Sequence, residues 1–268
     1  MVCSRLLTMD YGLSMKQIPN LFTLLNLIFG CIAIVFTLQN GIIMFTNEEG
    51  SQLLDIPEKI WMASLFIGLA AAVDFFDGFI ARLFKATSDM GKQLDSLADV
   101  VSFGVAPGMI IYQFLRLSHA QQPDGLDSSA IWLFVSFIIP AAAAYRLARF
   151  NLDSTQQYSF KGVPVPAVGL LIASLPLIYW NVNEAWVIQL LLNKWFLYGI
   201  ILLVSYLMVS SLPMISLKFK NFSLANNWPK YLLIAIAVAA ILLLKWLAVP
   251  VIFVAYVLVS LLFKNKIA

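Results

Sequence analysis

The chain has 268 residues, of which 61% are hydrophobic and 12% charged, with a formal net charge of +3 and a mean hydropathy of +0.88. Soluble globular domains carry roughly 25% charged residues, so this composition excludes them and indicates a polytopic membrane protein. The basic residues are spread over the loops rather than clustered, which excludes a nucleic-acid-binding surface.

Eight apolar stretches of about spanning length are predicted to be transmembrane α-helices. In chain order they are residues 21–38, 60–84, 95–117, 130–150, 163–180, 195–212, 231–246 and 247–263. The last two are short and are separated only by a turn near Pro250, so they can also form one bent pair. We expect an all-α polytopic membrane protein, with residues 1–17 as a cytoplasmic or interfacial segment and residues 18–268 as a single transmembrane domain.

The distribution of basic residues predicts the orientation of these helices. Of the 17 Lys and Arg residues, all fall on one side except Lys59, Arg116, Lys194 and Lys245. Basic residues near helix ends are retained in the cytoplasm, so both termini are expected there. Cys3 and Cys31 lie in a tail and inside a helix respectively, and we expect no disulfide between them.

Four carboxylates lie at the predicted cytoplasmic ends of the second and third helices. Asp74 and Asp77 are three residues apart, while Asp95 and Asp99 are four apart, so each pair lines one helix face. An uncompensated carboxylate in hydrocarbon costs several kcal/mol. With only oxygen ligands on offer, hard divalent cations such as Mg²⁺, Mn²⁺ or Ca²⁺ are favoured.

The residues beside these acids give a second clue. Gly78 and Ala81 lack bulk and let either a large ligand or another helix backbone approach closely, and Arg82 offers a fork suited to phosphate. Acids inside a helical membrane protein more often mark an ion or proton pathway, so a cation transporter is the alternative interpretation.

The complete pattern D-x2-D-G-x2-A-R-x8-G-x3-D-x3-D, at residues 74–99, resembles the signature of the CDP-alcohol phosphatidyltransferase family at every fixed position. The strings IPNLFTLLNLIFG at 18–30, GKQLDSLADVVSFGVAP at 91–107, RLARFN at 146–151 and KGVPVPA at 161–167 resemble its bacterial phosphatidylserine synthase branch. This resemblance covers roughly the first 180 residues.

The resemblance implies transfer of the phosphatidyl group from CDP-diacylglycerol to the hydroxyl of L-serine, with release of CMP. It assigns two divalent cations to Asp74, Asp77, Asp95 and Asp99, and the role of general base to Asp99. Sibling enzymes that use glycerol phosphate, inositol phosphate or choline remain an alternative. The resemblance also implies a homodimer and, in a bacterium, an inner-membrane enzyme whose site faces the cytoplasm.

The donor-binding residues implied by the resemblance surround the signature. They are Asn20, Thr23, Gly78, Ala81, Arg82, Thr87, Ser88 and Gly91. Asn20, Thr23 and Asn26 form a polar strip on the first helix that could face the cytidine, but hydrogen bonding between helices explains such a strip equally well.

Basic residues near the fourth and fifth helices are candidates for the acceptor site. Arg146 and Arg149 share a helix face and precede Asn151 in a family-like string, and Lys161 begins the next segment. A carboxylate-bearing acceptor such as serine needs such cations, and we expect these four residues to bind serine or phosphate. Anchoring by cytoplasmic basic residues is the alternative.

Overall fold

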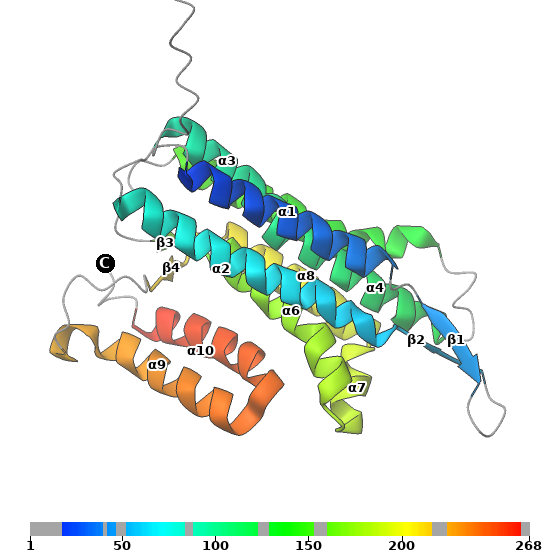
Figure 1. Cartoon of the computed structure of the whole chain (residues 1–268). Coiled ribbons are helices and arrows are strands. Elements are labelled where there is room, and N and C mark those ends of the chain that lie inside the picture. The colour runs from blue at the N-terminus through cyan, green and yellow to red at the C-terminus, as the bar shows by residue number, and fades with distance from the viewer. Residues whose placement is uncertain are drawn as a thin grey trace, which may run out of the picture.

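The computed structural model describes residues 18–39, 42–46, 52–83, 88–122, 129–152, 160–215 and 224–263. Over these ranges the chain is mostly helical, as the hydrophobic pattern predicts. Figure 1 shows the long helices running roughly along one common direction, which is the arrangement a bilayer requires. The N-terminal segment predicted at residues 1–17 lies outside the described residues.

Ten α-helices are described in the following order: α1 (Ile18–Gln39), α2 (Trp61–Leu83), α3 (Asp89–Asp99), α4 (Ala106–Ala120), α5 (Ile138–Leu152), α6 (Val165–Asn181), α7 (Ala185–Leu191), α8 (Lys194–Val209), α9 (Leu224–Leu244) and α10 (Ala248–Leu262). Shorter helical turns extend or join them: η2 (Glu58–Ile60), η3 (Val100–Val105), η4 (Ala130–Trp132), η5 (Phe134–Phe137) and η6 (Lys245–Leu247). Each of the eight predicted stretches overlaps at least one of these helices, and the stretches 95–117 and 130–150 each cover several of them.

Five helical segments among the described residues are long and apolar enough to cross a membrane, and the bent pair α7 and α8 makes a sixth. The five are Pro19–Gln39, Glu58–Gly78, Asp89–Ala120, Ala130–Leu152 and Asn227–Leu262. The last of these joins α9 and α10, which fold back on each other in Figure 1. The chain is therefore a multi-pass membrane protein, while the count of eight spans and the orientation stay predictions.

The mostly helical fold also contains two small antiparallel sheets that the sequence does not predict. Strand β1 (Ile43–Thr46) pairs with β2 (Gln52–Asp55) between α1 and α2, and β3 (Phe160–Lys161) pairs with β4 (Pro213–Met214). These strands have two to four residues each. Such short strands carry almost no alternating pattern, which is why the sequence does not reveal them.

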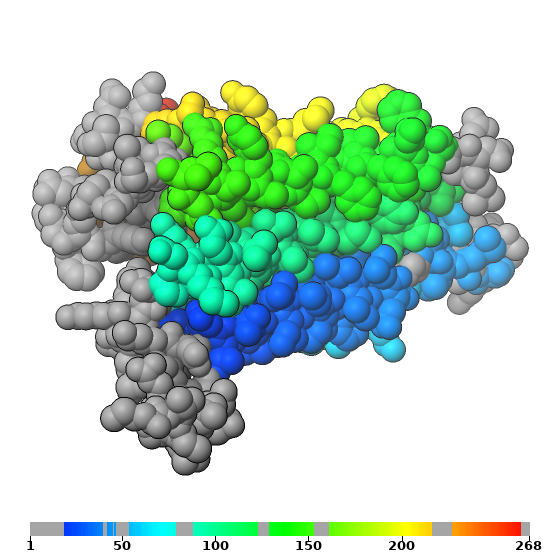
Figure 2. Space-filling model, turned by 90° about the horizontal axis from the view of Figure 1, so that it is seen from above, coloured from blue at the N-terminus to red at the C-terminus, as the bar shows by residue number. Residues whose placement is uncertain are grey.

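The helical segment α3–η3–α4 lies inside the bundle and organises the helices around it. α1 packs on α2, α3, η3 and α4, while α5 and α6 pack on η3. Figure 2 shows α1 in blue, α3 and α4 in teal and green, and α5 in brighter green side by side along one face. The buried side chains Phe103, Ile110 and Phe114 belong to this segment and form the centre of the core.

The crossing of α1 and η3 depends on a glycine. A Cβ atom added at Gly30 would lie 2.4 Å from Ser102 Oγ and 2.8 Å from Ser102 Cα. Close approach of helix backbones through small residues is the usual packing mode in membranes, where apolar burial between helices gives little driving force. Ser102 Oγ also donates a hydrogen bond of 2.9 Å to the carbonyl of Asn26, which fixes the two segments in register.

Candidate active site

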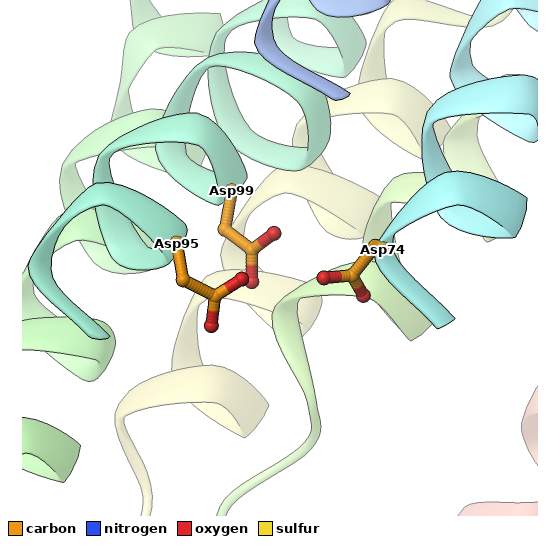
Figure 3. Close-up of side chains that lie close together, drawn as sticks. All are labelled: Asp74, Asp95 and Asp99. Atoms are coloured by element: carbon orange, nitrogen blue, oxygen red, sulfur yellow. The ribbon is translucent and has the colours of Figure 1, made fainter. Parts of the chain in front are cut away.

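Three carboxylates from two helices converge on one small volume. Asp74 comes from the second half of α2, and Asp95 and Asp99 come from α3. One oxygen from each lies within 4.8 Å of the others. Figure 3 shows the three side chains pointing toward one another across the space between the helices. The helical spacing that put Asp95 and Asp99 on one face therefore brings them opposite Asp74.

The local sequence explains why α3 begins where it does. Ser88 precedes the helix in extended conformation, and its side chain accepts a hydrogen bond of 3.0 Å from the backbone N–H of Gly91. A serine in this position satisfies one of the free N–H groups of the first turn. Directly after Asp99 the chain enters the π-helical segment η3, an irregularity that is frequent at functional sites.

Helix α1 supports the acids through its polar strip. Thr23 Oγ1 donates a hydrogen bond of 2.8 Å to Asp77 Oδ2, and Asn26 Nδ2 donates one of 3.3 Å to Asp99 Oδ1. Both polar side chains are buried. Interhelical hydrogen bonding, the alternative left open for this strip, is thus present in the structure, and contact of Thr23 with the nucleotide stays a prediction.

Asp77 lies beside the three converging acids but is not one of them. Its carboxylate is buried, interacts electrostatically with Asp95 and is held by Thr23. The predicted set of four acids is therefore present in one neighbourhood, while the compact group has three members.

The described donor-side residues lie close to one another. A Cβ added at Gly91 would come within 3.0 Å of Asn20 Oδ1, so α1 and α3 meet at this point. At Gly78 an added Cβ would meet no atom of the described residues within 4 Å, which leaves space beside α2. Ala81 and Arg82 belong to the last turn of α2, but their side chains lie outside the described part, as does Thr87 altogether.

The donor set fits a hard divalent cation. Asp95 Oδ1 is buried and has no hydrogen-bond partner among the described residues, so it lacks the compensation that a buried carboxylate oxygen requires. Three ionised carboxylates within a few ångströms of one another repel, and a bound cation removes that repulsion. Mg²⁺, Mn²⁺ and Ca²⁺ prefer such ligands.

The predicted acceptor-side residues divide into two groups. Arg146 is buried, its Nε has no hydrogen-bond partner among the described residues, and its guanidinium interacts electrostatically with Asp99. Asn151 Nδ2 donates a hydrogen bond of 2.9 Å to Ser96 Oγ, next to Asp95. Both residues therefore face α3. The sequence analysis does not predict a role for Ser96, although a hydroxyl residue directly after Asp95 in the signature indicates that it lies near the site.

Arg149 and Lys161 lie on the side of α8 and the second sheet. Arg149 Nη1 donates a hydrogen bond of 3.1 Å to the carbonyl of Val209, the last residue of α8. Lys161 belongs to β3, where it pairs with Pro213 of β4. Although Arg146 and Arg149 share a helix face, the structure gives their guanidinium groups different surroundings.

His119, the single histidine of the chain, lies at the far end of α4. Its Nδ1 is 2.9 Å from the carbonyl of Leu115, and its Nε2 is 3.4 Å from the hydroxyl of Tyr198. The helical segment α3–η3–α4 thus places the acids near its first turns and the histidine in its last turn.

The fold and the site together define a multi-pass membrane protein with a carboxylate group suited to divalent cations. The sequence model for CDP-alcohol phosphatidyltransferase matches residues 16–204. The chain therefore belongs to the CDP-alcohol phosphatidyltransferase family, which confirms the resemblance found in its signature. Helices α9 and α10 lie beyond the matched stretch.

Curated relatives carry one common name, CDP-diacylglycerol–serine O-phosphatidyltransferase. The protein from Mycobacterium tuberculosis is 32% identical over 254 residues, which cover 91% of this chain and 77% of that protein. The Helicobacter pylori protein is 33% identical over 208 residues, covering 76% and 72%. The Bacillus subtilis protein is 33% identical over 165 residues, covering 62% and 78%. These relatives confirm that the chain is an enzyme of this family, against the alternative of a cation transporter.

Proposed function

We propose that this protein transfers the phosphatidyl group of CDP-diacylglycerol to the hydroxyl of L-serine, giving phosphatidylserine and CMP. The observation that carries the proposal is the group of Asp74, Asp95 and Asp99 in a chain of this family. The names of the relatives from three bacterial genera support serine as the acceptor.

The acids would hold two divalent cations, Mg²⁺ or Mn²⁺, with Ca²⁺ as an alternative. Asp74, Asp95 and Asp99 form the compact group, and Asp77 would complete the second site. When bound, such cations neutralise the diphosphate and polarise the phosphorus that is attacked.

The donor would lie across the ends of α1, α2 and α3. The open space beside Gly78 leaves room for a nucleotide there, and Asn20 lies against Gly91 where α1 meets α3. Ala81 would keep the same face of α2 open, and Arg82 would pair with the diphosphate. Thr23, Thr87 and Ser88 would add hydroxyl contacts.

Asp99 would act as general base in a direct displacement. It accepts the proton of the serine hydroxyl while the serine oxygen forms its bond to the phosphatidyl phosphorus. The bond from that phosphorus to the bridging oxygen breaks, and CMP leaves with the electron pair. Asn26 supports this role because its amide holds one oxygen of Asp99 and leaves the other available.

Serine would bind on the side of α5. Arg146 is buried and interacts electrostatically with Asp99, and its Nε–H has no hydrogen-bond partner among the described residues. The carboxylate of serine could therefore accept a hydrogen bond from this guanidinium, whose positive charge would offset the negative charge of the carboxylate. Arg149, Asn151 and Lys161 would complete this side of the site.

The proposal also covers the orientation of the protein in the membrane and its oligomeric state. The positive-inside distribution of Lys and Arg supports cytoplasmic termini and a cytoplasmic site, in the inner membrane if the organism is bacterial. We also propose a single transmembrane domain over residues 18–268 and a homodimer, on the family resemblance.

Purified protein in detergent micelles with CDP-diacylglycerol and Mg²⁺ or Mn²⁺ tests the reaction. CMP is expected only when serine is added, and parallel reactions contain glycerol phosphate, inositol phosphate or choline. Asp99→Asn is expected to lower kcat by at least about 100-fold, the usual contribution of a general base, while CDP-diacylglycerol still binds. Asp89→Asn, an exposed position on the same helix, is the matched control. Activity with a different alcohol and none with serine would overturn the choice of acceptor.

A further inference from the structure

The C-terminal helix pair reaches the acceptor side of the site, although it lies beyond the stretch matched by the family. α10 packs on α6 and on β4. Its buried residues are Ala248, Phe253, Tyr256, Val259 and Ser260. Figure 1 shows α9 on the outer side of α10, so α10 is the member of the pair that lies nearer the remaining helices.

Two polar side chains of α10 hold a single backbone position. Tyr256 donates a hydrogen bond of 3.2 Å from its hydroxyl to the carbonyl of Ile215, and Ser260 Oγ accepts one of 3.2 Å from the N–H of Ile215. Tyr256 and Ser260 are the only residues of this helix with polar side chains, and they lie one turn apart on the same face. Both side chains are buried, and a buried hydroxyl needs a hydrogen-bond partner. The backbone of Ile215 provides that partner for each of them.

The residue held in this way directly follows the strand that pairs with Lys161. Ile215 follows β4, whose Pro213 and Met214 pair with Lys161 and Phe160 of β3. The turn after Lys161 is tightly fixed: Gly162 has φ +76°, and a Cβ there would lie 2.4 Å from the carbonyl oxygen of Met208. The position of the Lys161 backbone therefore depends on β4, and that of β4 on α10.

The same tyrosine lies within electrostatic range of the buried arginine of α5. The phenol of Tyr256 and the guanidinium of Arg146 interact electrostatically, and Arg146 also interacts with Asp99. Tyr256 thus joins two parts of the proposed acceptor side: the β3–β4 sheet through Ile215 and the arginine on α5.

From these contacts we infer that Tyr256 and Ser260 of α10 are positioning residues for acceptor binding, because both hold the end of the sheet that carries Lys161 and Tyr256 also interacts electrostatically with Arg146. The inference rests on the proposed function. Neither residue belongs to the acid group on α2 and α3, so the donor and metal sites should be insensitive to them.

The test compares Tyr256→Phe and Ser260→Ala with the wild type in the CMP-release assay, with serine and CDP-diacylglycerol each varied in turn. Each variant removes one hydrogen bond to Ile215 and keeps most of the packing. We expect the KM for serine to rise about fivefold or more, as the loss of one buried hydrogen bond implies. The KM for CDP-diacylglycerol and the Mn²⁺ concentration for half-maximal activity should change less than about twofold, which is below the change expected from one lost hydrogen bond.

Tyr206→Phe on α8 is the matched control, since the side chain of this tyrosine is 66% exposed. An unchanged serine KM in both variants, or an equal rise in both substrate KM values, would overturn the inference. If Tyr256→Phe is not recovered folded, Ser260→Ala decides by the same criteria. If the wild type itself rejects serine, the proposed acceptor fails, and the variants are then titrated with the alcohol that the wild type does use.

Discussion

The side-chain amide of Asn26 on α1 donates a hydrogen bond of 3.3 Å to Oδ1 of Asp99 at the end of α3. Asn26 is completely buried, and its backbone carbonyl accepts a hydrogen bond of 2.9 Å from Ser102 Oγ. The proposed general base is thus oriented by a residue of another helix, which is itself fixed to the segment that follows Asp99.

Asn26→Ala is expected to lower kcat by about 10- to 100-fold, because loss of a group that orients a metal-site ligand typically has an effect of this size. The measurement is CMP release at saturating substrates. Thr37→Val on the same helix is the control, since the Thr37 hydroxyl donates its hydrogen bond within α1, to the carbonyl of Ala33. Equal rates for Asn26→Ala and the wild type would remove Asn26 from the site.

Asp95→Asn addresses the metal site. Loss of one carboxylate ligand should raise the Mn²⁺ concentration for half-maximal activity by at least about tenfold, because even outer-shell changes have effects of that order. Chelation with EDTA should abolish activity of the wild type, and Mn²⁺ should restore it.

A second readout for Asp95→Asn is thermal unfolding in detergent without metal. Since Asp74, Asp95 and Asp99 repel one another when no cation is bound, the variant should then unfold at a higher temperature than the wild type. Added Mn²⁺ should stabilise the wild type more than the variant. An identical response of both proteins to Mn²⁺ would contradict a cation at these acids.

The acid group could be predicted from the sequence because its determinants are local. Asp95 and Asp99 are one turn apart, and a short connection between α2 and α3 brings Asp74 to the same end of the bundle. The role of the polar strip could not be decided, since spacing places Thr23 and Asn26 on one face of α1 but does not say which helix that face meets. The hydrogen bonds to Asp77 and Asp99 depend on packing between distant segments.

The acceptor side shows where sequence spacing is insufficient. Arg146 and Arg149 are three residues apart, yet one approaches Asp99 while the other reaches the carbonyl of Val209. A long arginine side chain can turn toward different neighbours, so a shared face does not imply a shared ligand. The contribution of α10 was also missed, although two hydroxyl side chains in an otherwise apolar helix were a signal that they meet polar partners.

Arg146→Gln and Arg149→Gln should therefore differ. Arg146→Gln is expected to raise the serine KM by about tenfold or more, because a hydrogen bond to a charged group contributes roughly 1.5–3 kcal/mol. Arg149→Gln should raise it less, since the Arg149 guanidinium is already engaged with Val209. Arg149→Gln should also lower the unfolding temperature, because the carbonyl at the end of α8 loses its partner. A larger effect on serine KM from Arg149→Gln than from Arg146→Gln would reverse this assignment.

Gly30→Ala tests whether the close contact of α1 with η3 supports the site. The added methyl would meet Ser102 at distances that require a backbone shift, and overpacking of this kind costs about 1–3 kcal/mol. We expect a lower unfolding temperature in detergent and a lower kcat, since Ser102 lies three residues after Asp99 and binds the Asn26 carbonyl. Gly68→Ala on α2 is the matched control, because no described atom lies within 4 Å of its added Cβ and alanine favours the helix. If the two variants unfold at the same temperature, the approach of α1 to η3 does not depend on Gly30; if only kcat falls, the contact acts on the geometry of Asp99 more than on stability.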